Sequence, residues 1–196
     1  MKNKIKSTEI RKKALEATSV LDLILVDILT CTNILRIFDK PFFSRKFSPI
    51  MAAGIHRMCL WYLFLALCRW YEFYIRYKKI LPAGSVAICR DLSNEIQKRG
   101  IIGFRNKVIG HIWDNEAECP LSDKEVSEYI RRIAKDDFTS FYQWIIDFKE
   151  NIYPKTVVSI VETLRDKIME QNSISSEELG LKHLLTKNTA FSELKE

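Results

Sequence analysis

The sequence predicts an all-α protein, and three observations point to that fold class. Apolar residues recur mostly at intervals of three and four along the 196-residue chain, which is the spacing of one helix face. Glycine and proline are scarce, at 6 and 5 residues, so few positions force a turn. No alternating run of Val, Ile and Thr is bounded by a two-residue glycine turn, so we expect no sheet.

The length of the chain suits one compact domain with a sizeable core. Its content of 47% hydrophobic and 29% charged residues is ordinary for a globular protein and argues against a disordered chain. No internal repeat or linker divides the sequence. We therefore predict a single helical domain over residues 1–172 and a polar tail over 173–196, with one short helix at Glu177–Leu185.

The first helix is expected over Ser7–Phe38, where apolar residues form a broad stripe. Asp22 and Asp27 lie in or near this stripe. Because a buried carboxylate needs a partner, we expect both side chains at the edge of the stripe, capped or paired with a neighbouring arginine.

A loop over Asp39–Pro49 follows, since proline lacks the backbone donor and restricts the residue before it. The loop mixes three phenylalanines with three basic residues, which include Arg45 and Lys46. Interleaved aromatic and basic side chains can stack bases and neutralise phosphates, so Arg45 and Lys46 are candidate RNA-binding residues. The alternative is that the phenylalanines pack under the loop as a small apolar cluster.

A second long helix is expected over Pro49–Leu81, and it is apolar nearly all round. Such a helix must be surrounded by other helices or covered by another subunit. Its most apolar run, Met58–Cys68, is about half of the roughly 20 residues that cross a bilayer, and Arg69 and Glu72 interrupt any extension. We therefore interpret it as the central core helix and expect no membrane partner.

Local signals delimit the helices that follow. A third helix over Ser85–Lys98 should end at Gly100, because glycine is the usual residue after a helix end. A short helix or turn is then expected from Gly103 to about Trp113.

The second half of the chain contains two further helix starts. Ser122 and Glu125 form a capping box, which predicts a helix that begins there and reaches about Lys149. Pro154 suits the first turn of a last helix, because the donor that proline lacks is unused at that position.

Charge and cysteine content narrow the class of protein. The 31 Lys and Arg residues exceed the 25 Asp and Glu residues, and the net charge of +6 favours an anionic partner, either nucleic acid or an acidic protein. The 5 cysteines are widely spread and form no C-x-x-C pair. This pattern is typical of reduced, buried thiols in a cytoplasmic protein and disfavours a disulfide framework or a zinc site. We expect neither a metal nor another cofactor.

The segment from Phe104 to His111 contains the residues with the clearest chemistry. Arg105 is always protonated and presents a planar fork that fits phosphate oxygens, whereas His111 can take or give a proton near pH 7. RNA carries its own nucleophile, the 2'-hydroxyl, so a catalyst needs only to orient it, move a proton and neutralise charge. Arg105 and His111, with Asn106 to orient the histidine or the sugar, suit cleavage of RNA without a metal.

The Arg105-Asn106 pair followed by His111 resembles the Arg-polar-x4-His motif of HEPN domains. The order of helices around the motif looks most like the HEPN domains of abortive-infection and toxin–antitoxin systems, over roughly residues 10–170. The resemblance implies a bundle of four to six helices, dimerised through the motif face, and a metal-independent endoribonuclease. A toxin or phage-defence effector of this kind would have RNA as its substrate and, in some systems, an antitoxin protein as its partner.

By the same resemblance Arg105 and His111 are the catalytic residues, and Asn106 is the polar member of the motif. We add Lys107 as an auxiliary phosphate contact. Two alternatives stay open. One is a non-catalytic helical module of the same kind that binds RNA, a nucleotide or a partner protein, and the other is a helical scaffold whose second helix recruits another protein.

The spacing of the motif creates a geometric difficulty. In a regular α-helix, positions six apart differ by about 240° around the axis and about 9 Å along it, so Arg105 and His111 would not point the same way. Either the helix is interrupted, for which Gly110 is the expected place, or Arg105 of one subunit works beside His111 of the other. Dimerisation is the simpler solution.

Overall fold

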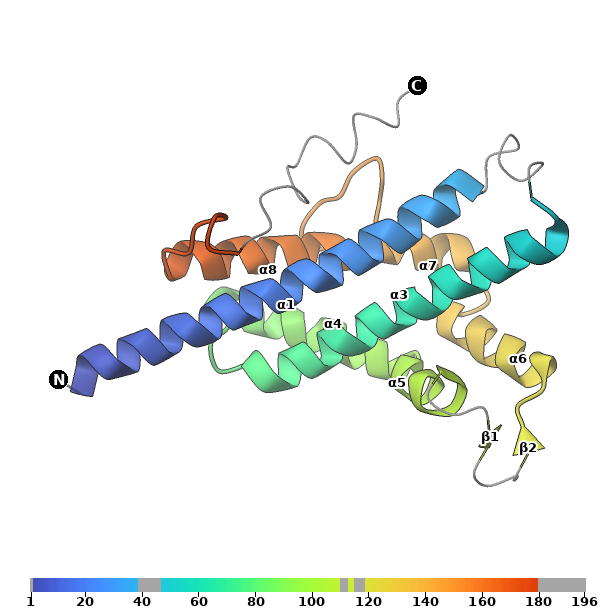
Figure 1. Cartoon of the computed structure of the whole chain (residues 1–196), viewed down its shortest axis with the longest axis horizontal. Helices are drawn as coiled ribbons and strands as arrows, with labels where there is room; N and C mark the ends of the chain where they lie inside the picture. The colour runs from blue at the N-terminus through green and yellow to red at the C-terminus, as the bar shows by residue number, and fades with distance from the viewer. Residues whose placement is uncertain (1, 39–46, 110–112, 115–118, 180–196) are drawn as a thin grey trace.

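The computed structural model describes residues 2–38, 47–109, 113–114 and 119–179, and within them the protein is an all-α bundle, as predicted (Figure 1). Seven α-helices are present in this part of the chain. The expectation of no sheet needs one addition, because Trp113–Asp114 (β1) pairs antiparallel with Cys119–Pro120 (β2). Strands of two residues are too short to leave an alternating pattern in a sequence.

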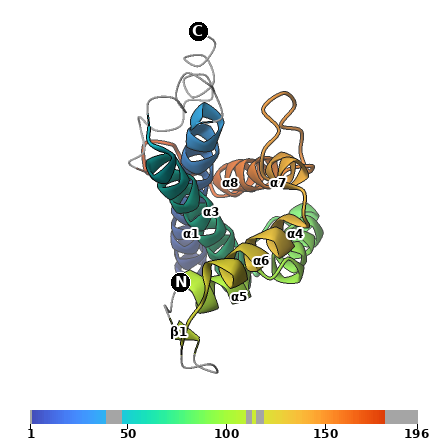
Figure 2. The same cartoon turned by 90° about the vertical axis from the view of Figure 1, so that its right-hand side faces the viewer.

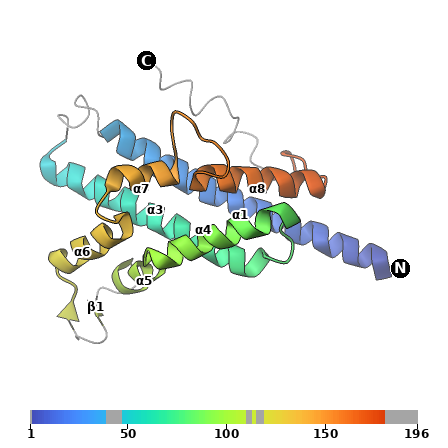
Figure 3. The same ribbon diagram turned by 180° about the vertical axis from the view of Figure 1, so that it is seen from behind.

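Two long helices form the first layer of the bundle. They are α1 (Lys2–Phe38) and α3 (Pro49–Tyr77), which lie side by side (Figures 1 and 2). The second layer contains α4 (Val86–Lys98), α7 (Phe138–Ile145) and α8 (Val157–Gln171), seen in front in Figure 3. The core lies between the layers, where α8 packs on α1 and α4 packs on α3.

The two carboxylates of the first helix both have arginine partners, as expected. Asp27 forms an ion pair with Arg69 of α3, and Asp22 lies 3.2 Å from Arg165 of α8. Asp22 is buried rather than at the edge of the apolar stripe, since α8 covers it. Burial raises the pKa of the Asp22 carboxyl, and the attraction of Arg165 opposes that rise.

Aromatic side chains connect α3 to the rest of the core. The Phe64 ring meets Phe104 edge-to-face at 5.1 Å and Phe141 at 6.0 Å, which fixes α5 (Ile101–Phe104) and α7 against α3. By length and composition alone, α3 could also cross a membrane. That is weak support for a span, because the core helix of a water-soluble bundle meets the same criteria.

One face of α3 is not covered by the described helices. Ile50, Met51, Met58 and Tyr62 are exposed, with 87% of Ile50 and 62% of Met58 open to solvent. The helix that was predicted to lie at the centre of the core is therefore buried on one side only. Its remaining apolar face is available to another subunit or partner.

Helix α4 ends just before Gly100, the glycine that was predicted to end it. Gly100 has a φ of 78°, in the left-handed region that glycine adopts without strain, and its amide donates to the Gln97 carbonyl at 2.9 Å. A short 3-10 turn, η1 (Ala83–Ser85), precedes α4. Where a short helix or turn was expected from Gly103 to about Trp113, the structure has the single α-helical turn α5, which begins at Ile101, and a π-helical turn over Arg105–Ile109.

The long helix predicted from Ser122 to Lys149 was wrong beyond its first twelve residues. Its capping box is present, but α6 (Asp123–Ala134) ends where Lys135 and Asp136 adopt positive φ values of 54° and 60°. Arg99 donates to the carbonyl of Ile133 at 2.8 Å and so satisfies the end of α6. A new helix, α7, then begins with the Asp137 side chain as its cap.

The last helix begins three residues after Pro154. Thr156 accepts the Ser159 amide at 3.1 Å, and Ser159 accepts the Thr156 amide in return, so this reciprocal cap places the start of α8 at Val157. The chain after α8 stays attached to the domain through buried Ile174 and the 2.6 Å ion pair between Arg11 and Glu178. Residues 177–179 form a turn, and the rest of the helix predicted at Glu177–Leu185 lies outside the described residues.

Candidate ribonuclease site

The predicted catalytic arginine lies at the start of a π-helical turn. This turn, η2 (Arg105–Ile109), directly follows α5. The regular α-helix is thus interrupted at Arg105, five residues before Gly110, where we expected the break. π-helical turns are rare and occur frequently at functional sites. Gly110, His111, Arg45 and Lys46 lie outside the described residues.

Buried aromatic contacts place Arg105 at the surface. Phe104 is fully buried, and its ring contacts Phe64 of α3 at 5.1 Å and Tyr129 of α6 at 6.4 Å. The next residue, Arg105, has 36% of its side chain exposed. The anchor at Phe104 therefore holds the guanidinium beside α3 while leaving it accessible to a ligand.

Two described residues bind the Arg105 guanidinium. Its Nε donates to the Asn106 Oδ1 at 3.1 Å, and its Nη1 donates to the Glu72 carboxylate of α3 in an ion pair. A guanidinium has five N–H donors. Within the described part of the chain these two bonds leave three donors for a phosphate group.

In the structure the Asn106 side chain binds Arg105, a contact that the sequence did not predict, and Glu72 is a second partner of the guanidinium. Asn106 and Lys107 are both exposed, and Lys107 makes no ion pair with a described residue. Glu72 was not among the predicted site residues, and in the sequence it stood out only as a charge that interrupts an apolar run. The sequence does contain a signal for this ion pair, because Glu72 is a carboxylate on a mostly apolar helix and such a group needs a basic partner.

Cys68 lies next to this site but is not a nucleophile. Its Sγ is 3.7 Å from the Ile101 carbonyl, and burial raises the pKa of the thiol to about 11, despite the attraction of Arg105. No group of three or more His, Cys, Asp and Glu side chains in the described ranges could hold a metal ion. The chemistry available here is that of a guanidinium, an amide and a carboxylate.

Comparisons with known proteins bear on the fold. No protein-family model matches the chain, and no curated protein matches it. Among solved structures, an integron cassette protein from the mobile metagenome of V. paracholerae is similar, with a TM-score of 0.64 and 22% identity. The match covers 80% of this chain and 96% of that one. At this identity the similarity supports the helical fold alone.

Proposed function

We propose that this protein is a metal-independent endoribonuclease of the HEPN type that acts as a homodimer in the cytoplasm, as a toxin or phage-defence effector. One observation carries the proposal. Arg105 is held at the surface on an interrupted helix, Asn106 binds its Nε, and three of its donors face no described partner. His111, six positions later, supplies the group that titrates near neutral pH.

The proposed reaction needs one proton acceptor and one anion binder. His111 takes the proton of the ribose 2'-hydroxyl, the 2'-oxygen attacks the adjacent phosphorus, and the bond from phosphorus to the 5'-oxygen breaks. A proton returns to the 5'-oxygen as it leaves. Arg105 binds the non-bridging oxygens as their charge grows, a contribution of about 3 to 4 kcal/mol for a good donor in other enzymes. The products are a 2',3'-cyclic phosphate and a 5'-hydroxyl.

The uncovered face of α3 supports dimerisation at this site. Met51, Met58, Leu65 and Glu72 follow one another at seven-residue intervals, so they share one side of the helix. Met51 and Met58 are exposed, and Glu72 binds Arg105. A second copy that lies along this whole side of α3, from the two methionines to Glu72, also approaches Arg105, which is the arrangement that a shared Arg–His site requires.

The direct test is RNA cleavage by the purified protein in EDTA, with the ends of the products identified. Arg105→Ala and His111→Ala should each abolish cleavage while the helical circular dichroism spectrum is unchanged. Arg90→Ala, which removes an exposed arginine of α4, is the matched control and should cleave normally. Unchanged cleavage in either motif variant would remove the mechanism, and a strictly monomeric protein would remove the shared site.

The ion pair between Glu72 and Arg105 favours a second candidate function. A carboxylate that neutralises the guanidinium suits a non-catalytic module that binds RNA, a nucleotide or an antitoxin-like partner. Such a module would shift RNA in a gel without cutting it, and the binding would weaken steeply with salt if phosphate contacts dominate. Cleavage of the shifted RNA on long incubation would exclude a non-catalytic module.

A further inference from the structure

A cavity of about 580 Å³ lies between the first half of α3 and α6, apart from the Arg105 site. Leu60, Val126 and Ile130 form an apolar floor, and Ile50 lies at one edge. Small-molecule sites in proteins have volumes of about 300 to 1,000 Å³, with apolar walls and a few placed polar groups. The volume lies in this range, and the site is an open one, since Ile50, His56, Arg57, Asp123 and Ser127 are all exposed.

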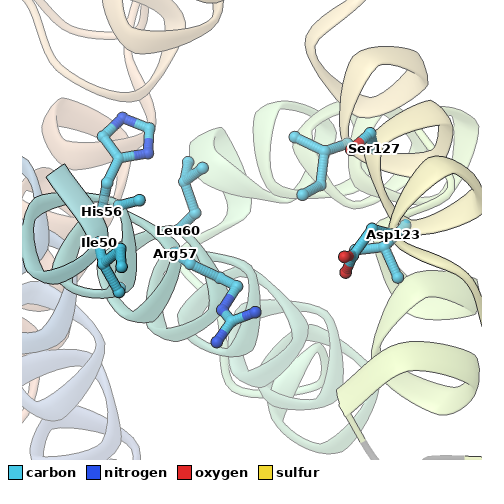
Figure 4. A pocket seen from close by; sticks show the side chains of 10 residues that line it. Ile50, His56, Arg57, Leu60, Asp123 and Ser127 are labelled. Carbon is cyan, nitrogen blue, oxygen red and sulfur yellow. The ribbon is translucent and has the colours of Figure 1, made fainter.

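Charged groups of opposite sign stand on its two sides. Figure 4 shows Arg57 of α3 and Asp123 of α6 pointing into the gap from opposite walls. Arg57 lies 5.4 Å from the centre of the Trp61 ring, which orients its guanidinium. Arg57 and Asp123 form no ion pair with each other or with another described residue. His56 and Ser127 complete the polar lining.

This arrangement matches the parts of a single nucleotide. A planar base can pack on the aliphatic side chains of Leu60, Val126 and Ile130, and a phosphate can bind the Arg57 guanidinium. The Asp123 carboxylate is an acceptor only, so it selects bases by the N–H groups on their edge. Guanine offers two adjacent donors, N1–H and the N2 amino group, to one carboxylate, whereas uracil offers one.

We propose that the cavity between α3 and α6 binds one nucleotide of an RNA strand, with guanine preferred. The choice of a nucleotide over another small anion rests on the proposed ribonuclease function. Arg57 and Glu72 are 15 residues apart on α3 (72 minus 57), which places the cavity about 22 Å along the helix from the Arg105 site. Stacked nucleotides span this distance in about six steps of 3.4 Å. The cavity therefore sets where the strand is cut relative to a guanosine.

Calorimetric titration of the full chain with GMP, AMP, CMP, UMP and guanosine tests the proposal without relying on cleavage. GMP should bind most tightly, and guanosine more weakly because it lacks the phosphate. Asp123→Asn should reduce the preference for GMP over AMP about tenfold, the effect of losing one bidentate pair. Arg57→Gln should weaken all four monophosphates about equally and leave guanosine binding unchanged.

Two matched variants control for charge. Glu128→Gln removes an exposed carboxylate of α6 outside the cavity, and Arg90→Gln removes an exposed arginine of α4. Both should bind GMP as the wild type does. Equal binding of the four nucleotides, no binding at millimolar concentration, or preferential binding of a zwitterionic amino acid such as phenylalanine would each overturn the proposal.

The cavity and the ribonuclease site can fail separately. If the wild type never cuts RNA but GMP still binds, also to Arg105→Ala, the proposed nuclease function is wrong and the proposed nucleotide site remains supported. If the wild type and Asp123→Asn cut RNA at the same positions and GMP does not bind, the proposed nucleotide site is wrong and the nuclease function remains supported.

Discussion

Replacing Glu72 with glutamine should strengthen the binding of RNA. The change keeps the shape of the side chain and removes the negative charge that pairs with Arg105. A phosphate then no longer competes with a carboxylate for the same guanidinium. The expected gain is no larger than the strength of the Glu72–Arg105 ion pair, because the phosphate binds the three donors that this pair and Asn106 leave open.

The exposure of the pair limits that gain. The side chains of Arg105 and Glu72 are 36% and 57% exposed, so water screens their attraction. Exposed ion pairs contribute about 0.2 to 1 kcal/mol, which corresponds to a dissociation constant lowered by about 1.4-fold to 5-fold. The difference between wild type and variant should shrink as salt is added, because salt screens exposed charges.

The assay is fluorescence anisotropy with a labelled single-stranded RNA, using His111→Ala as the background so that the RNA stays intact. Asp91→Asn is the matched control, since it raises the net charge equally and frees the exposed Arg90. It should leave binding near the wild-type value. Weaker RNA binding by Glu72→Gln, or the same effect of this substitution when Arg105 is alanine, would contradict a role for the ion pair.

Three further outcomes follow from the fold. Arg165→Met should destabilise the protein by about 3 kcal/mol in urea denaturation, because it leaves the buried Asp22 carboxylate unpaired, and adding Asp22→Asn should restore part of the loss. Gly100→Ala should cost about 1 to 2 kcal/mol from backbone strain alone, since no atom lies within 4 Å of the added carbon, whereas Gly103→Ala should cost nothing. Cys89, whose pKa burial raises to about 12, should resist thiol reagents at pH 8 until the chain unfolds, and rapid labelling of the native protein would contradict its burial.

Features that depend on a few neighbouring residues were predictable from the sequence. Gly100 ends α4 because its φ of 78° suits glycine, and the Ser122–Glu125 capping box starts α6. The long apolar stripes of the first two helices were visible as spacing alone. In each of these cases the signal and the structure that it specifies lie within one or two turns of the same helix.

Features that depend on distant contacts were missed. The break between α6 and α7 is stabilised by Arg99, which reaches the Ile133 carbonyl from 34 residues away. The apolar spacing continues through the break, so periodicity could not locate it. The start of α8 was misplaced for a different reason, since the reciprocal Thr156–Ser159 cap outweighs the preference of Pro154 for a first helical turn.

By itself, the sequence determined the helical class and the helix ends that have a strong local signal, such as Phe38, Pro49 and Lys98, because these depend on local spacing and backbone preference. Only the tertiary structure decided that Glu72 binds Arg105 and that Arg57 and Asp123 share one cavity. Those pairs come from helices that are far apart in the chain. Which faces of α3, α5 and α6 meet is decided by the packing of buried rings such as Phe64, Phe104 and Tyr129.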